Sequence, residues 1–278
     1  MADPKVWFIT GCSKGFGRIW AEAALERGDK VAATARDAST LAPLTDRYGD
    51  DDVLALALDV QDMEADHAAV EQAHEKFGRL DVVVNNAGYG LFGTVEEVSA
   101  EQARDQIETN VFGALWVTKA ALPILREQGS GHVIQVSSIG GVTAFPGIGL
   151  YHASKWALEA FSQSLSLEVA SFGVKVTLVE PQGYSTDWGG PSAVQAKPLE
   201  AYEPIRAARR KMREDGTMTQ ADPDAGGPAI LKLVDAEEPP LRCFFGAQAF
   251  GLVRPDYERR IAGWEEWDWL AKEAHGGQ

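Results

Sequence analysis

The chain has 278 residues, of which 45% are hydrophobic, and its 26 Lys and Arg against 41 Asp and Glu give a formal net charge of −15. This composition supplies enough apolar side chains for the core of one large α/β domain, and we interpret residues 1–278 as a single domain. A strongly acidic surface repels both a phosphate backbone and an anionic bilayer, so we expect no nucleic-acid partner and no membrane partner.

Short apolar runs alternate along the chain with longer segments of helical period. This pattern predicts a single Rossmann-type doubly wound parallel sheet of about seven strands, with helices on both faces. The expected strands span residues 6–10, 30–35, 53–58, 81–84, 132–137, 174–180 and 241–245. The expected helices span residues 15–27, 61–77, 99–128 and 151–172, with a short helix near 228–235. A capping box is expected at Ser99 and Gln102.

Between the first strand and the first helix lies a glycine-rich turn, Thr10-Gly-Cys-Ser-Lys-Gly-Phe-Gly17. In this position, bare backbone N–H groups can bind a pyrophosphate. Gly11 permits the sharp turn, Gly15 the close approach of the ligand and Gly17 tight helix packing. The alternative is that these glycines merely end a strand. The predicted cofactor contacts in this turn are Gly11, Ser13, Lys14, Gly15, Phe16 and Gly17.

The end of the second expected strand bears on the choice of dinucleotide. A carboxylate there would bind the free ribose 2′-hydroxyl of NAD, but the sequence has Ala35 followed by Arg36. Arg36 and Lys14 together offer two positive charges to a 2′-phosphate, so we expect NADP(H). Two alternatives remain: a register slip would bring Asp37 to the ribose, and Arg36 could be a solvated surface charge.

Tyr151 and Lys155 lie four residues apart in a segment of helical period, so both side chains project from one face. A free tyrosine has a pKa of about 10, and we expect the neighbouring ammonium, with an oxidised nicotinamide, to lower it. Such a pair suits proton transfer, although taken alone it also fits an ordinary helix-surface pair.

From about residue 6 through residue 245, these features resemble the short-chain dehydrogenase/reductase family in order and spacing. The glycine turn resembles that family's cofactor loop, Asp59-Val60 its adenine contact, and Asn85-Asn-Ala-Gly88 its motif beside the cofactor. Ser138 precedes Tyr151 by thirteen residues, which is the family's separation of serine and tyrosine. Further cofactor contacts that the resemblance implies are Asp59, Val60, Asn86, Ala87, Gly88, Tyr151, Lys155, Pro181, Gly183 and Thr186.

The resemblance also implies catalytic roles for Asn110, Ser138, Tyr151 and Lys155. Tyr151 would protonate a carbonyl oxygen that Ser138 orients. Lys155 would hold the ribose hydroxyls and tune Tyr151, and Asn110 would hold a water that links Lys155 to solvent. One departure stands out, because Gln182 replaces the glycine that the family usually has after Pro181. We expect Gln182 either to shape the substrate pocket or to shift the following loop.

The implied activity is NADPH-dependent reduction of a ketone to a secondary alcohol, by a homo-oligomer that is a tetramer or a dimer. The alternatives are an NAD(P)-dependent secondary alcohol, steroid or retinol dehydrogenase, and a cofactor-binding regulator without activity. Apolar side chains in the expected substrate loops favour a hydrophobic ketone or alcohol. These residues are Phe92, Phe145, Ile148, Leu150, Tyr184 and Trp188.

The regular pattern fails over residues 184–225, which is typical of a substrate lid. The basic cluster there fits a solvated helix face, and contact with an acidic substrate is the alternative. Its members are Arg206, Arg209, Arg210 and Lys211. In the C-terminal extension, 247–278, the helical spacing of Trp264, Trp267 and Trp269 predicts packing against a core, with a ligand-binding role as the alternative. We expect this extension to cover an edge of the sheet or a subunit contact.

Two classes of special chemistry are not expected. The histidines show no metal-ligand spacing, so we predict no metal site. We also expect that His152 does not act as a second acid beside Tyr151, because adjacent helical residues point in different directions. Cys12 and Cys243 lie far apart and outside any C-x-x-C pair, so we expect free thiols.

With no apolar run long enough to span a bilayer and no basic leader, we expect a cytoplasmic protein.

Overall fold

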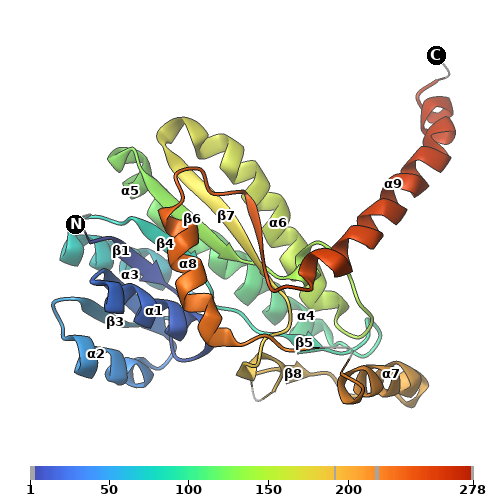
Figure 1. Cartoon of the computed structure of the whole chain (residues 1–278), viewed down its shortest axis with the longest axis horizontal. Coiled ribbons are helices and arrows are strands. Elements are labelled where there is room, and N and C mark those ends of the chain that lie inside the picture. Colours follow the sequence, from blue (N-terminus) through green and yellow to red (C-terminus); the bar gives the residue numbers. More distant parts are fainter. Residues whose placement is uncertain (1–3, 191, 217–218, 277–278) are drawn as a thin grey trace.

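The computed structural model of the chain describes residues 4–190, 192–216 and 219–276 (Figure 1). Seven parallel strands form one sheet in the order β3-β2-β1-β4-β6-β7-β9. They are β1 (Val6–Ile9), β2 (Lys30–Ala35), β3 (Val53–Ala57), β4 (Val82–Asn85), β6 (Gly131–Val136), β7 (Val174–Pro181) and β9 (Arg242–Phe245). The predicted sheet is confirmed, with each strand within one residue of its expected bounds.

Helices cover both faces of the sheet because successive strand side chains point to opposite sides. Trp7 and Ile9 belong to the core under α1 (Gly15–Arg27), α2 (Ala42–Tyr48) and α8 (Gly226–Asp235). Phe8 belongs to the opposite core, under α3 (Met63–Phe77), α5 (Ala114–Gln128) and α6 (Gly149–Val169). The expected doubly wound α/β architecture is therefore present, with α2 as a helix that the sequence pattern did not reveal.

The helix expected over 99–128 is interrupted. It consists of α4 (Ala100–Ile107), a π-helical turn (Glu108–Gly113) and α5. The predicted capping box is present: Ser99 Oγ accepts a hydrogen bond from the Gln102 backbone N–H, and Gln102 Oε1 accepts one from Ser99 N–H. A π turn widens the helix locally, and here it places Asn110 in the interior, where only 1% of it is exposed.

The segment after β7 crosses the carboxyl edge of the sheet. Its short strand β8 (Val194–Gln195) pairs with β5 (Leu91–Phe92), and α7 (Glu203–Glu214) follows. Arg206 pairs with Glu97 and Glu203, and Arg209 stacks over the Phe92 ring at 4.5 Å. The interpretation of a solvated basic face is therefore wrong for Arg206 and Arg209, while Lys211 is exposed as expected.

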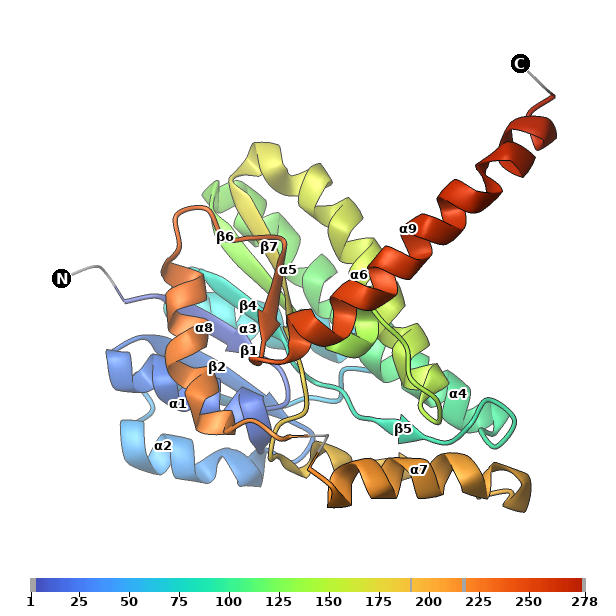
Figure 2. The ribbon, with the colours of Figure 1, turned by 45° about the vertical axis from the view of Figure 1, so that its right-hand side comes forward.

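The last helix, α9 (Ala249–Ala274), begins against the body and then leaves it (Figures 1 and 2). Ala249 and Val253 are buried in its first turns. Trp264, Trp267 and Trp269 are 70%, 56% and 57% exposed, so the expectation that they pack against a core was wrong. Their spacing is helical, but no other part of the described chain lies alongside that stretch. In the described ranges, no helix is long and apolar enough to cross a membrane.

Candidate active site

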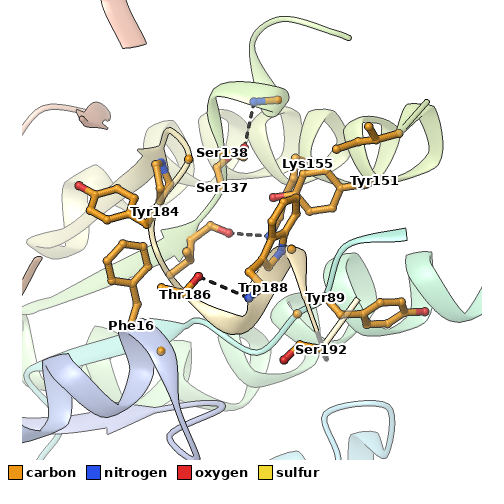
Figure 3. A pocket seen from close by; sticks show the side chains of 18 of the residues that line it. Phe16, Tyr89, Ser137, Ser138, Tyr151, Lys155, Tyr184, Thr186, Trp188 and Ser192 are labelled. Atoms are coloured by element: carbon orange, nitrogen blue, oxygen red, sulfur yellow. Dashed lines mark hydrogen bonds between the residues drawn. The ribbon is translucent and has the colours of Figure 1, made fainter. Parts of the chain in front are cut away.

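A cleft of about 2070 Å³ opens at the carboxyl edge of the sheet. The strand order reverses between β1 and β4, and in such sheets ligands bind in the crevice at that point. The loops that follow β1, β2, β4, β6 and β7 line the cleft, together with α7 and the first turn of α9. Of the residues expected from the sequence to bind a cofactor or to catalyse, all except Gly17 and Asn110 line this one cavity (Figure 3).

The glycine turn has the geometry of a phosphate cradle. Gly11 and Gly15 adopt φ of +72° and +60°, and no atom lies within 4 Å of a Cβ built on Gly15. A Cβ on Gly17 would lie 2.4 Å from the carbonyl oxygen of Gly11, so a side chain there would displace the turn. Since no side chain caps the N-terminus of α1, its first N–H groups remain available to an anion.

Asn86 holds this turn against β4. Its Nδ2 donates to the carbonyl oxygens of Thr10 at 2.9 Å and Gly11 at 3.1 Å, and Thr10 Oγ1 accepts from the N–H of Ala87 at 2.9 Å. The asparagine-alanine-glycine stretch thus fixes the first and fourth strands together at the floor of the cleft.

The far end of the cleft contains the groups relevant to a ribose 2′ position. Lys14, Ala35 and Arg36 line it, and Arg36 is exposed. The carboxylate of Asp37 instead accepts hydrogen bonds from the backbone N–H of Ser39 at 3.0 Å and its hydroxyl at 2.7 Å. These bonds lower the pKa of Asp37. Asp59 and Val60 also line this end, and Val60 is buried against Gly113.

Tyr151 and Lys155 project from α6 into the same part of the cleft, as their spacing predicts. Lys155 Nζ lies 5.8 Å from the centroid of the Tyr151 ring and donates to the carbonyl oxygen of Val136 at 2.7 Å. Ser138, in the loop after β6, lies beside them (Figure 3), and its hydrogen bond to Tyr151 lowers the pKa of that phenol.

In the chain by itself, burial acts against the expected lowering of the Tyr151 pKa. Burial raises the pKa of Tyr151 to about 12, against the opposing hydrogen bond of Ser138. Burial also lowers the pKa of Lys155 to about 8, against the opposing charge of Glu159. The sequence shows the spacing of the two groups but not how completely they are withdrawn from water, and withdrawal outweighs proximity here.

Asn110 lies behind the lysine. Its Oδ1 accepts from the N–H of Tyr89, and its Nδ2 donates to the Tyr89 carbonyl and to Ser154 Oγ, each at 3.1 Å. A Cβ on Gly88 would lie 3.0 Å from Asn110 Oδ1 and 3.8 Å from Lys155 Nζ. Gly88 therefore allows the asparagine and the lysine to approach the loop after β4.

The segment after β7 brings Pro181, Gly183 and Thr186 to the cleft. Gln182 lines the cleft too, which agrees with the first of its two expected arrangements. Its Oε1 accepts a hydrogen bond from the backbone N–H of Gln248 at 2.8 Å, and it packs against Gly246. The side chain that replaces the expected glycine therefore joins β7 to the start of α9.

Apolar groups form the wall next to Tyr151. The Trp188 ring lies 4.9 Å from the Tyr151 ring, and Phe92 supports Trp188 from behind at 5.4 Å. Phe145, Ile148 and Tyr184 also line the cleft, as expected, whereas Leu150 is not among the residues that do so.

Sequence reasoning missed the contributions of α7 and α9 to this wall. They are Pro204, Ile205, Ala208, Arg209, Met212, Gln248, Gly251 and Leu252. The apolar positions within the basic helix were a signal that could have indicated a cleft-facing side. His152 lines the cleft too, but burial and the charge of Arg209 lower its pKa to about 4, so it is neutral at pH 7. In the described residues, no group of three or more His, Cys, Asp and Glu is placed to hold a metal ion.

Residues 5–195 match the family described as short chain dehydrogenase. The chain belongs to the short-chain dehydrogenase/reductase family. Members of this family are oxidoreductases that act on alcohol and carbonyl groups, and this activity class applies to the present chain.

Individual relatives agree with this assignment. The chain is 43% identical over 264 residues to Oxidoreductase BOA17 of Botryotinia fuckeliana, covering 95% of this chain and 96% of that protein. A short-chain dehydrogenase from Streptomyces avermitilis superposes with a TM-score of 0.90 at 37% identity, over 98% of this chain and 99% of the other. An alcohol dehydrogenase from the archaeon Thermococcus sibiricus, solved with 5-hydroxy-NADP, superposes with a TM-score of 0.73 at 28% identity, over 87% and 96% of the two chains.

Proposed function

We propose that this oxidoreductase uses NADPH to reduce an apolar ketone to a secondary alcohol, with Tyr151 as the proton donor. The observation that carries the proposal is that Tyr151, Ser138 and Lys155 line the same cleft as the glycine turn. A bound NADPH would supply the hydride. All other steps fall to side chains of this chain.

Each side chain has a task that its position supports. Ser138 would donate a hydrogen bond to the substrate carbonyl oxygen and orient it beside Tyr151. With a pKa of about 12, Tyr151 is protonated at neutral pH and can donate its proton to that oxygen. Lys155 would bind the ribose hydroxyls and stabilise the resulting phenolate, while Asn110 would hold a water through which the proton is replaced.

The preference for NADPH is supported by the charges at the far end of the cleft. Lys14 and Arg36 are both at this end, and a 2′-phosphate would meet two cations. Asp37, the acid that could replace them in recognising NAD, is already occupied by Ser39. The relative from Thermococcus sibiricus, solved with 5-hydroxy-NADP, is consistent with this preference.

Steady-state consumption of NADPH against aliphatic, aryl and steroidal ketones tests the proposal, with NADH as the comparison. We expect turnover with hydrophobic ketones and a loss of about 10²- to 10⁴-fold in kcat for Tyr151→Phe. The variant should still bind NADPH, measured by cofactor fluorescence. Absence of turnover with every ketone would contradict the proposal and favour the alcohol dehydrogenase or a regulator, whereas full turnover by Tyr151→Phe would contradict the role of Tyr151 as proton donor.

We further propose one domain of residues 1–278 with a lid at 184–225, assembled into a homo-oligomer in the cytoplasm. The free thiols Cys12 and Cys243 are consistent with a reducing compartment.

Support for assembly comes from the exposed tryptophans on α9, because a helix that projects alone gains little stability without packing. Replacing Trp264, Trp267 and Trp269 by Gln should lower the molar mass measured by light scattering. A mass that stays unchanged would contradict a contact through α9.

A further inference from the structure

A buried charged cluster lies directly behind the site and has no part in the chemistry described above. Glu159 follows Lys155 by one turn of α6, and Glu180 precedes Pro181 at the end of β7. Glu159 and Glu180 are only 4% and 1% exposed. Ser137, next to Ser138, faces them, since a Cβ on Gly141 would lie 2.5 Å from Ser137 Oγ and 3.1 Å from Glu159 Cγ. The cluster thus joins α6, which carries Tyr151, the loop after β6, which carries Ser138, and the end of β7.

The hydrogen bonds of the cluster do not balance if both carboxyls are ionised. Arg242 Nε donates to Glu159 Oε2 at 2.8 Å and lies 3.7 Å from Glu180 Oε1. The Oε1 atoms of Glu159 and Glu180 are buried and lack a well-formed hydrogen bond to the described residues, as does the buried Oγ of Ser137 beside Glu159. Ionised carboxylates only accept hydrogen bonds, so a proton on one of them would supply the missing donor.

The surroundings decide which carboxyl keeps the proton. Burial and the charge of Glu159 raise the pKa of Glu180 to about 8. Burial also raises the pKa of Glu159, but Ser137 and Arg242 oppose that rise. Arg242 is closer to Glu159, and Lys155 lies one turn away on the same helix, so the negative charge is favoured on Glu159 and the proton on Glu180.

We propose that Glu159 and Glu180 share one proton, and that the charge left on Glu159 is the counter-charge that keeps Lys155 an ammonium. Both glutamates are positioning residues, and the proposal rests on the role of Lys155 in the proposed function. The charged and titratable groups that face the pair are Lys155 on α6, Arg242 on β9 and Cys243 beside Glu180, and the neutral hydroxyl of Ser137 faces Glu159 as well.

The direction of the effect on Lys155 follows from two opposing causes. Burial disfavours its ammonium, and the charge of Glu159 favours it. The hydrogen bond from Lys155 Nζ goes to the uncharged carbonyl oxygen of Val136, which cannot substitute for an anion. Loss of the charge on Glu159 therefore lowers the pKa of Lys155, and the enzyme loses the ammonium at a lower pH.

Two isosteric substitutions separate the charge from the proton. Removing the charge takes the double variant Glu159→Gln/Glu180→Gln, because in Glu159→Gln alone Glu180 loses the neighbouring charge that helps to keep it protonated. The double variant should move the basic limb of the kcat–pH profile down by about one pH unit. Glu180→Gln is the matched control, because its amide can donate to Glu159 as the protonated acid does, and it should leave the limb where it is in the wild-type enzyme. An unmoved limb in a folded double variant, or an equal shift in Glu180→Gln, would overturn the proposal.

A second measurement needs no turnover and so stands apart from the ketone assay. Infrared spectra of wild-type protein labelled with carboxyl-¹³C glutamate should show a protonated glutamic acid at pH 7 that disappears in Glu180→Gln. Because only glutamate carries the label, an isotope-shifted band cannot come from the buried Asp66. If the wild-type protein shows no such band, the shared proton does not exist and the proposal is overturned, even if neither variant folds. If ketone reduction fails while the band is present, the proposed function is contradicted and the shared proton is still supported.

Discussion

Gln182 and Gln248 connect the strand that leads into the active site with the helix that leaves the molecule. The Oε1 of Gln182 accepts the backbone N–H of Gln248 at 2.8 Å. This contact depends on Gly246, whose φ is +130° and on which a Cβ would lie 2.2 Å from Gln182 Cγ. Because Leu252 in the first turn of α9 lines the cleft, Gln182 links the position of α9 to the shape of the substrate wall.

Replacing Gln182 by Gly should loosen the start of α9. We expect the loss of one hydrogen bond to cost about 1 kcal/mol, and the KM for the ketone to rise more than the KM for NADPH. Thermal unfolding, limited proteolysis of α9 and steady-state kinetics measure these effects. Gln182→Glu, which keeps an acceptor for Gln248 N–H, is the control. Unchanged proteolysis together with an unchanged KM for the ketone would show that the contact is unimportant.

Cofactor preference should follow the two cations near the ribose. Combining Arg36→Ser with Lys14→Ala is expected to raise the KM for NADPH about tenfold or more, with little effect on NADH, because two charge-assisted contacts to a phosphate are lost. The control is Asp37→Ala, which should change neither KM because Ser39 already occupies that carboxylate. Equal losses with both dinucleotides would argue against a 2′-phosphate site.

Gly17→Ala should disrupt the phosphate cradle. The added methyl would lie 2.4 Å from the carbonyl oxygen of Gly11, and a backbone atom cannot move aside as a flexible side chain can. We expect a loss of stability of about 1–3 kcal/mol, by overpacking, and a weakened affinity for NADPH, measured by denaturation and fluorescence titration. Gly263→Ala, where no atom lies within 4 Å, should not lower stability. A Gly17→Ala protein with normal NADPH affinity would refute the assigned geometry.

Asp66 should make the fold less stable as pH rises. Both of its carboxylate oxygens are buried without a hydrogen-bond partner, and burial with the charges of Asp62 and Asp59 raises its pKa from 3.8 to about 8. The contribution of Asp66 to the free energy of unfolding is fully present below the pKa that Asp66 has in the unfolded chain. It is lost as the pH rises towards the pKa of Asp66 in the folded protein, with a slope of at most about 1.4 kcal/mol per pH unit.

Urea unfolding of wild-type and Asp66→Asn proteins at pH 5 and pH 8 measures this contribution. The free energy of unfolding of the variant should fall less between the two pH values than that of the wild-type protein. Glu180 gives a trend of the same sign in both proteins, so the difference between them isolates Asp66. Parallel pH dependences would mean that Asp66 titrates normally.

Much of the site was predictable because its signals are local. The continuous apolar runs predicted all seven sheet strands, since strands buried on both faces need apolar side chains at every position. The glycines at 11, 15 and 17 predicted the turn, because backbone conformation and close contacts restrict those positions to glycine. The four-residue spacing of Tyr151 and Lys155 predicted their shared face, since helix geometry alone determines it.

The tertiary structure decided what depends on neighbours distant in sequence. The withdrawal of Tyr151 from water, which raises its pKa, depends on Trp188 and other residues of separate segments. Helical spacing also placed Trp264 on a helix, but whether another element covers it is a property of the assembled fold. Local sequence therefore determined the elements and the reacting groups, while long-range packing determined their burial and charge, because the dielectric surroundings of a group are set by every segment that folds around it.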